Sequence, residues 1–352
     1  MDFKTNMIKT LKTNHGTVTL PSFFPDGTLG VVRGVDSIDL ENAQVEGLVI
    51  NTFHLMTNKI DQKIKKFKGI HGFMNWQRSV ITDSGGFQVM SLVHDHPEMG
   101  KISDQGITFK WNGEKILLTP EKSIEFQLKL GTDIAIVLDD CVRPEMGLED
   151  QKKSVERTIS WAKRSKTEFD LLASQGTSGK AKPLLFSVVQ GGNNKKLRKY
   201  CAEELIQIGF DGYCFGGFPV QNGKFLSEIV GYVAKLLPDD KPKYALGVGK
   251  PENIVECVQF GYQIFDCVIP TREARHQKLY IHEGKSYSNI NIGRGIYVQD
   301  KNPISKNCDC HTCKNFSRAY LHHLFKIKDS SAFRLATIHN LRFYSMLMEA
   351  LK

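Results

Sequence analysis

The stretch PLLFSVVQ (183–190) decides the fold of this 352-residue chain, together with NKKLRKYCAEELIQI (194–208) and DGYCFG (211–216) that follow it. The first and third segments are short, largely apolar runs, as expected of parallel strands that are buried on both faces of a sheet. The segment between them is long enough for a helix. Together they indicate a strand–helix–strand unit of the kind found in parallel α/β proteins.

The same alternation of short apolar runs and longer helical patterns recurs along most of the chain. Further strand-like runs cover residues 17–24, 47–53, 79–83, 133–139, 243–247 and 263–269, and helical patterns cover 147–173, 225–237 and 251–260. Thr119-Pro120-Glu121 opens another helix with an N-cap, a proline and an acidic first turn. Eight strands with intervening helices favour an α/β fold of the (β/α)8 TIM barrel type. An open doubly wound sheet is the alternative.

Polar residues and glycines stand at the ends of most of the predicted strands. They are Asn51, Asp83, Asp139, Asp140, Gln190, Gly216, Gly217, Gly247 and Asp266. An aspartate at the end of a single strand more often caps a helix than takes part in a reaction. Because several such residues share the carboxyl-terminal rim of the predicted barrel, where barrel enzymes build their sites, we expect a functional site there.

Residues 276–352 do not continue the alternation, so we divide the chain into a catalytic barrel over 1–275 and a smaller C-terminal subdomain over 276–352. Residues 277–292 favour short strands, whereas 315–327 and 331–351 favour helices. The last helix has an apolar face formed by Leu335, Ile338, Leu341, Met348 and Leu351. We expect the subdomain to pack on the barrel.

Three cysteines, Cys308, Cys310 and Cys313, lie within six residues of this subdomain. They are too close in sequence to pair with one another in a relaxed loop, and their thiolates suit a tetrahedral zinc ion. Candidates for the fourth ligand are His311, His322, His323 and His339. His339 on the last predicted helix can clamp that helix to the cysteine loop. Three cysteines and His339 leave no open position, so we expect the zinc to be structural.

The composition, with 41% hydrophobic and 24% charged residues, is typical of a soluble globular protein. The first residues lack the apolar core of a signal peptide, and no run approaches the ~18 apolar residues of a membrane span, so we expect a cytoplasmic protein. The net charge of +9 fits a solvated surface as well as it fits a polyanionic partner. The other cysteines lie in apolar segments, where reduced, buried thiols are usual.

Several motifs resemble those of bacterial tRNA-guanine transglycosylases, in the order of that family and over nearly the whole chain. They are NTFHL (51–55), ITDSGGFQVM (81–90), VQGG (189–192), LGVGKP (246–251), FDCVIPTR (265–272) and FSRAYLHH (316–323) between the cysteines and His339. The resemblance implies a (β/α)8 barrel with a zinc subdomain, in a homodimer. It also implies exchange of guanine at the wobble position of tRNA anticodons for a 7-deazaguanine, which is preQ1 in bacteria and queuine in eukaryotes.

The resemblance assigns roles to the residues that match these motifs. Asp266 falls at the nucleophile, which would attack the ribose C1′ as guanine leaves and form a covalent ribosyl-aspartate. Asp83 falls at the general acid and base. The base pocket is expected to comprise Asp139, Gln190 and the Gly217 amide, with Ser84 in support and with Phe87 and Leu246 sandwiching the ring. The anticodon loop is expected to contact Lys250, Arg272 and Arg275.

The segment GGFPVQN (216–222) departs from the family's usual Gly-Gly-Leu-Ala-Val-Gly-Glu. Pro219 removes a backbone donor from a peptide that senses the aminomethyl arm of preQ1, and Asn222 replaces a supporting glutamate. Val220 and Cys141 match the bacterial enzymes, and a valine at this position should obstruct the bulkier queuine. We therefore expect preQ1 as the incoming base.

Other functions remain open at this point. A non-catalytic tRNA-binding partner subunit would be expected to lose the nucleophile or the pocket residues, which are present. A transglycosylase acting on DNA would share the nucleophile and zinc motifs, and queuine or preQ0 are alternative incoming bases. An unrelated barrel enzyme for small molecules would leave the tRNA-matching motifs unexplained. Arg143, near the predicted pocket mouth, has no assigned role.

Overall fold

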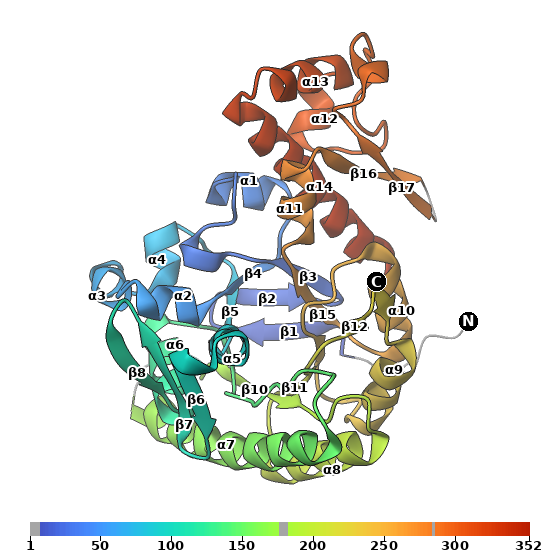
Figure 1. Cartoon of the computed structure of the whole chain (residues 1–352). Coiled ribbons are helices and arrows are strands. Elements are labelled where there is room, and N and C mark those ends of the chain that lie inside the picture. The colour runs from blue at the N-terminus through green and yellow to red at the C-terminus, as the bar shows by residue number, and fades with distance from the viewer. Residues whose placement is uncertain (1–7, 176–181, 284–285) are drawn as a thin grey trace.

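The computed structural model describes residues 8–175, 182–283 and 286–352. Eight parallel strands form one sheet in the order β3-β15-β14-β11-β10-β9-β5-β4, and helices surround it (Figure 1). The strands are β3 (Ser22–Pro25), β4 (Gly47–Ile50), β5 (Ser79–Thr82), β9 (Ile134–Ile136), β10 (Leu184–Val189), β11 (Gly212–Phe215), β14 (Lys243–Ala245) and β15 (Ile264–Cys267). Between the end strands, the Gly27 N–H donates to the Val49 carbonyl at 2.7 Å, so the ring nearly closes. The predicted α/β barrel is confirmed.

Helices connect successive strands along the outside of the ring. They are α1 (Ser37–Asn42), α2 (Thr52–Thr57), α3 (Asp61–Ile64), α4 (Ile70–Met74), α5 (Gly86–Asp95), α6 (Pro120–Leu130), α7 (Leu148–Gln175), α8 (Lys195–Ile208), α9 (Ser227–Leu236), α10 (Pro251–Phe260) and α11 (Ile269–Arg275). Short 3-10 turns are η1 (Thr28–Gly30), η2 (Lys65–Phe67), η3 (Pro97–Met99) and η4 (Gly295–Tyr297). The start of α6 agrees with the sequence, since the Thr119 hydroxyl accepts from the Lys122 N–H at 3.3 Å.

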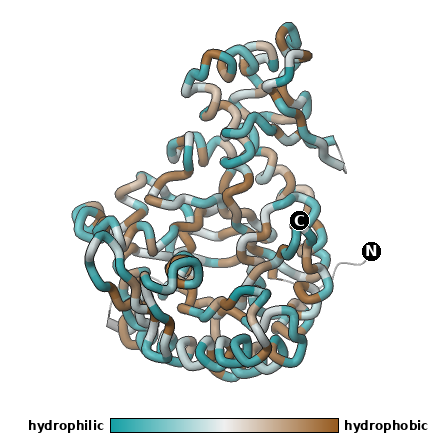
Figure 2. Tube along the Cα trace, viewed as in Figure 1, coloured by the Kyte–Doolittle hydropathy of each residue, from teal (hydrophilic) through white to brown (hydrophobic). Residues whose placement is uncertain are grey.

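Apolar side chains fill the barrel wall. Every residue of β4, β5, β9 and β11 is buried, which explains why these strands read as continuous apolar runs. Phe24, Phe186, Phe215 and Phe265 are fully buried. Figure 2 shows hydrophilic residues along the outer helices, with α7 and α8 at the bottom of the view. Among the described residues, a helix with both the length and the apolar character of a membrane span is absent.

The sequence does not predict three of the small antiparallel sheets. The run 17–24 divides into β2 (Gly16–Thr19), which pairs with β1 (Thr10–Thr13), and β3, because Pro21 lacks the N–H that a continuous strand would donate. Strands β6 (Gly100–Ser103), β7 (Gly106–Trp111) and β8 (Glu114–Leu118) form a sheet between α5 and α6. Strands β12 (Val220–Gln221) and β13 (Lys224–Phe225) form a hairpin after β11.

The C-terminal residues form a smaller lobe at the top of Figure 1. It comprises β16 (Lys278–Glu283), β17 (Ser286–Asn291), α12 (His311–Asn315), α13 (Arg318–Lys326) and the start of α14 (Ser330–Ala350). Leu279, Leu321 and Leu335 belong to a separate buried apolar cluster. Helix α14 returns to the barrel, where the Tyr344 hydroxyl donates to the Gly249 carbonyl at 2.6 Å. The last predicted helix therefore packs on the barrel, while the division of the chain at residue 275 stays a prediction.

Candidate active site

A cavity of about 470 Å³ opens at the carboxyl ends of the barrel strands. Its lining includes every residue that the sequence predicts for catalysis and base binding, namely Asp83, Ser84, Phe87, Asp139, Gln190, Gly217, Leu246 and Asp266. These residues belong to different strands and the loops after them, so only the barrel topology brings them together. The polar strand ends do mark one site, and the roles of its residues stay predictions.

Asp83 lies directly after β5 and accepts four hydrogen bonds. Its Oδ2 accepts from the Asn51 side chain at 2.7 Å, and its Oδ1 accepts from the Thr52 N–H at 2.9 Å, the Thr52 hydroxyl at 3.0 Å and the Gly85 N–H at 3.0 Å. Burial outweighs these bonds and raises the pKa of Asp83 to about 6. The carboxyl is therefore held in place and can give and take a proton near neutral pH.

Asp266 lies in β15 and faces the same cavity. Its Oδ1 accepts from the Gly247 N–H at 2.8 Å. Burial raises the pKa of Asp266 to about 6, and the Gly247 amide and the nearby Tyr244 hydroxyl oppose this rise. Above that pH the side chain is an ionised carboxylate that faces the cavity, which suits a nucleophile. Tyr244 was not predicted, because it reads as an ordinary residue of a buried strand.

Asp139 and Gln190 form a hydrogen-bonded pair beyond β9 and β10. The Gln190 side-chain amide donates to Asp139 Oδ2 at 2.6 Å. Burial raises the pKa of Asp139 to about 7, and the charges of Asp140 and Asp83 add to the rise. The side chain of Asp139 therefore changes between an ionised carboxylate and a neutral carboxylic acid near physiological pH. One Gln190 N–H donates to Asp139 in this structure, whereas the sequence predicts that Gln190 donates to the base.

The cavity wall after β11 is formed by Gly216, Gly217 and Phe218. Gly217 has a φ of +87°, a left-handed conformation that favours glycine. Phe218 packs against Phe87 with ring centroids 5.6 Å apart, and Phe87 remains 47% exposed. Leu246 completes the apolar lining, so a planar base would meet an aromatic and an aliphatic side chain. No motif in the sequence predicts the Phe87–Phe218 contact.

Lys250, Arg272 and Arg275 do not line the cavity. Within the described ranges, none of the three forms an ion pair with a carboxylate. Arg275 is partly buried, and the charges of Arg33 and Arg272 add to that burial in lowering its pKa. Lys250 is exposed at the start of α10. Their charges are therefore not neutralised by carboxylates of the described residues.

Arg143 and Asp140 both have charged partners outside the reaction site. Arg143 pairs with Asp95 at the end of α5, and because both side chains are largely exposed, the pair contributes little to stability. Asp140 is buried and pairs with Arg157 of α7. These contacts explain both residues as links between loops and helices around the cavity.

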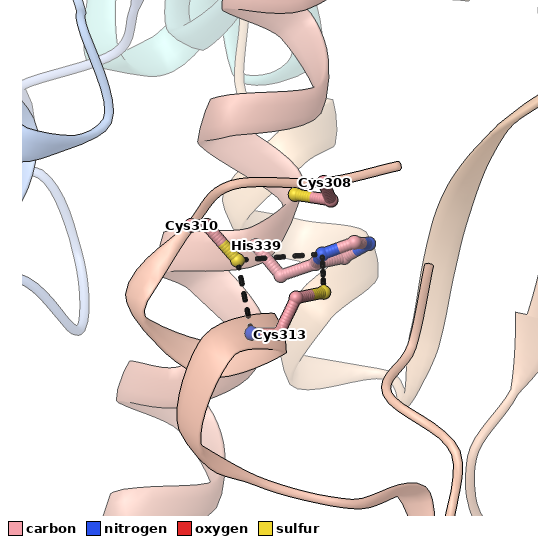
Figure 3. Close-up of side chains that lie close together, drawn as sticks. All are labelled: Cys308, Cys310, Cys313 and His339. Atoms are coloured by element: carbon pink, nitrogen blue, oxygen red, sulfur yellow. Dashed lines mark hydrogen bonds between the residues drawn. The ribbon is translucent and has the colours of Figure 1, made fainter. Parts of the chain in front are cut away.

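The four predicted metal ligands, Cys308, Cys310, Cys313 and His339, come together with their ligand atoms within 4.8 Å of one another (Figure 3). The His339 Nδ1 lies 3.3 Å from the Cys313 sulfur and 3.7 Å from the Cys310 sulfur. Its Nε2 bonds to the Tyr280 carbonyl at 2.6 Å, which fixes the tautomer that turns the Nδ1 lone pair towards the thiols. The set could bind a metal ion, and three sulfurs with one imidazole fit a closed tetrahedral zinc site.

The other histidines near the cysteines do not join this cluster. His311 and His323 are exposed, and the Nδ1 of the buried His322 bonds to the Ile292 carbonyl at 2.8 Å. Among these candidates the sequence favours His339, on the last predicted helix. The path of α14 back past the cysteine loop selects His339.

A second group, His15, His71 and Asp133, meets at the amino ends of the strands. Asp133 lies 2.9 Å from the His15 Nδ1 and 3.2 Å from the His71 Nε2, and it also accepts from the Val80 N–H at 2.8 Å. The His71 Nε2 also bonds to the Arg78 carbonyl at 3.0 Å, so this nitrogen carries a proton and has no lone pair for a metal. These hydrogen bonds link the β1–β2 hairpin to the barrel.

Comparisons with known proteins agree with the motif resemblance. The family described as queuine tRNA-ribosyltransferase matches residues 5–352. The queuine tRNA-ribosyltransferase of Idiomarina loihiensis is 43% identical over 340 residues, which cover 96% of this chain and 87% of that protein. The protein of the same name from Blochmanniella floridana is 43% identical over 346 residues, covering 97% and 88% of the two chains. The chain therefore belongs to the queuine tRNA-ribosyltransferase family of pentosyltransferase enzymes.

Proposed function

We propose that this enzyme exchanges the wobble guanine of tRNA anticodons for preQ1 through a covalent ribosyl-aspartate. The observation that carries the proposal is the meeting of Asp83, Asp139 and Asp266 on one cavity, each with a pKa raised by burial. Perturbed carboxyls gathered in a cleft are typical of a catalytic site. A non-catalytic partner subunit would have no use for all three, so we favour an active enzyme.

In the first displacement, the Asp266 carboxylate attacks the ribose C1′. The bond between C1′ and guanine N9 breaks, its electron pair passes to the base, and Asp83 gives its proton to the departing guanine. The products are free guanine and an ester between Asp266 and C1′. The hydrogen bonds to Asp83 and Asp266 hold both carboxyls in position during this step.

In the second displacement, N9 of the incoming base attacks C1′ and releases Asp266 as a carboxylate. Asp83 takes the proton that N9 loses and returns to its starting state. Two inversions at C1′ retain the configuration of the nucleoside, as in a retaining glycosidase whose second acceptor is a base.

One edge of the base is recognised by two sets of partners. Ionised Asp139 accepts from N1–H and the 2-amino group, while Gln190 and the Gly217 N–H donate to the 6-carbonyl. Buried partners of this kind reject a base with the wrong edge, because their polar groups would remain unpaired. Guanine and preQ1 share this edge, so one pocket serves both the leaving and the incoming base.

Preference for preQ1 is supported by the wall beside Phe218. Cys141 and Pro219 line the cavity. Pro219 lacks the backbone donor of the family's usual peptide, so the preference rests on the size and stiffness of the wall and not on that donor. Val220 and Asn222 lie in the β12–β13 hairpin beyond this wall. A stiff wall favours the compact aminomethyl arm over the larger ring of queuine, and preQ0 is the other compact candidate.

The proposed partners are the tRNA anticodon loop and a zinc ion. Lys250, Arg272 and Arg275 hold the anticodon loop, which their lack of ion-pair partners among the described residues supports. A structural zinc joins the cysteine loop to α14 through His339. The whole activity belongs in the cytoplasm.

We also propose a homodimer, as the family resemblance implies. Ile296 is 72% exposed on the C-terminal lobe, and Val298, Tyr320 and Ile327 are exposed there as well. The proposal itself rests on the family resemblance, and these exposed side chains mark the lobe as one place where a second copy can pack. Sedimentation at working concentration should give a dimer, and a monomer would contradict this part.

The experiment that tests the function is displacement of labelled guanine from tRNA by preQ1, preQ0 and queuine in parallel. We expect release with all competent bases and the fastest release with preQ1. Faster release with queuine would overturn the preQ1 assignment, and release from DNA but not from tRNA would favour the DNA-acting alternative. No release under any condition would overturn the proposed function.

A further inference from the structure

Arg198 of α8 lies behind the cavity wall where β10 and β11 end, and only 1% of it is exposed. Its Nη1 donates to the Val189 carbonyl at 2.5 Å and to the Gly216 carbonyl at 2.9 Å. Its Nε donates to the Gly192 carbonyl at 2.8 Å. A single side chain therefore ties together the two strand ends that carry Gln190 and Gly217.

The guanidinium of Arg198 has no carboxylate partner within the described part of the chain. Burial lowers its pKa to about 10, so it remains charged at neutral pH. Three carbonyls and the face of Phe215, whose ring centroid lies 4.4 Å from the guanidinium carbon, surround the charge instead. A buried unpaired charge costs free energy that an apolar side chain would not. This cost indicates a geometric task rather than packing alone.

The Gly216 carbonyl belongs to the same peptide unit as the Gly217 N–H. This peptide is trans and planar, so its C=O and N–H point in opposite directions. Because Arg198 holds the carbonyl, the N–H is turned away from the guanidinium, and Gly217 itself lines the cavity. Glycine is conformationally permissive, so without this bond the peptide would have more freedom to turn.

Helix α8 also fixes the peptide that precedes Gln190, at both its carbonyl and its amide end. The Val189 carbonyl accepts from Arg198 and from the Gly216 N–H, the latter at 3.0 Å. The Gln190 N–H bonds to the Cys201 sulfur at 3.3 Å. Arg198 and Cys201, one turn apart on α8, thus hold the residue whose side chain faces Asp139.

We infer that Arg198 is a positioning residue that aims the Gly217 N–H and Gln190 at the 6-carbonyl of a guanine-like base. The inference rests on the proposed function and adds to it a residue that does not touch the base. Without Arg198, only one part of base recognition should be impaired. Recognition of the 6-carbonyl is lost, whereas recognition of the 2-amino group by Asp139 remains.

The test compares Arg198→Lys and Arg198→Met with Arg164→Lys. Calorimetry measures the binding of guanine, 6-thioguanine, which has a weaker acceptor at position 6, and hypoxanthine, which lacks the 2-amino group. Arg164 is a matched control because it also donates to two backbone carbonyls, those of Asp104 and Gln105, but does not line the cavity. Circular dichroism checks that each variant is folded, and Arg198→Lys decides if Arg198→Met does not fold.

We expect Arg198→Lys to bind guanine about tenfold more weakly, the effect of losing one charge-assisted hydrogen bond. Its preference for guanine over 6-thioguanine should fall, while its preference for guanine over hypoxanthine should persist. An unchanged first preference, or a parallel loss of both, would overturn the inference and leave the proposed function intact. If the unaltered protein shows no preference for guanine over 6-thioguanine, the reading of the 6-carbonyl in the proposed function fails as well.

Discussion

Acidification should weaken the binding of free guanine through one group, Asp139. Its carboxyl must be ionised to accept from N1–H and the 2-amino group of the base, yet burial raises its pKa to about 7. Between pH 8 and pH 6 the ionised fraction falls from about nine-tenths to about one-tenth. Guanine should therefore bind about tenfold more weakly at pH 6 than at pH 8, a difference of about 1.4 kcal/mol.

Two variants separate Asp139 from the other acidic groups of the cavity. Asp139→Asn cannot ionise, so its weakened guanine binding should not change between pH 8 and pH 6. Asp83→Asn retains Asp139 and should keep the slope, with its midpoint at a slightly lower pH, because the charge of Asp83 adds to the rise in the pKa of Asp139.

The assay is titration calorimetry in two buffers that differ in ionisation enthalpy. At pH 6 the binding of guanine should release nearly one proton, since the base binds only the ionised carboxyl. An affinity that stays constant from pH 6 to pH 8 in the unaltered protein would refute the reasoning. A slope that persists in Asp139→Asn would refute it equally.

Three further outcomes concern stability and metal. Asp133→Asn should lower the free energy of unfolding by about 2 kcal/mol at pH 7, because the folded-state pKa of Asp133, about 2, lies below the usual 3.8. The difference between the two proteins should disappear as the pH falls towards 2. Equal denaturant midpoints at pH 7 would contradict this prediction. His339→Ala should lose its zinc and melt at a lower temperature, and a full equivalent of bound zinc in that variant would reject His339 as a ligand. Asp139→Asn should be more stable than the unaltered protein at pH 8 and should lose that advantage towards pH 4. The reason is that a carboxyl with a raised pKa makes the folded state less stable as the pH rises. Thermal denaturation at both pH values measures the difference.

Most of the barrel could be predicted from the sequence because its strands are buried on both faces. Runs such as 183–190 contain little besides apolar residues, and β10 occupies Leu184–Val189 of that run. The sheet of β6, β7 and β8 could not be predicted in the same way. Its strands are partly exposed, and their mixed polar and apolar residues form no continuous run.

The candidate site was partly predictable for a topological reason. Parallel strands in a barrel bring their carboxyl ends to one rim, so Asp83, Asp139 and Asp266 could be grouped without knowing any side-chain direction. Arg198 and Tyr244 could not be found this way. Their importance depends on contacts made across neighbouring strands and helices, and in the sequence each resembles an ordinary helix or strand residue.

The cluster of three cysteines and His339 shows the same division between local and long-range information. The spacing of the three cysteines is local and predicted a thiolate group directly. The choice of the histidine depends on where α14 passes after the chain has left the cysteine loop. The folded chain brings the predicted His339, and none of the other three candidate histidines, to the cysteines, and the Tyr280 carbonyl fixes its ring.

The central claim is that the Asp266 carboxylate becomes bonded to the ribose during exchange. Its most direct test is to mix the enzyme with tRNA, remove the released guanine, denature the sample and map the protein–tRNA adduct by peptide mass spectrometry. The adduct should be on Asp266 and should be absent from Asp266→Asn. An undiminished adduct in that variant, or one mapped to another residue, would contradict the account.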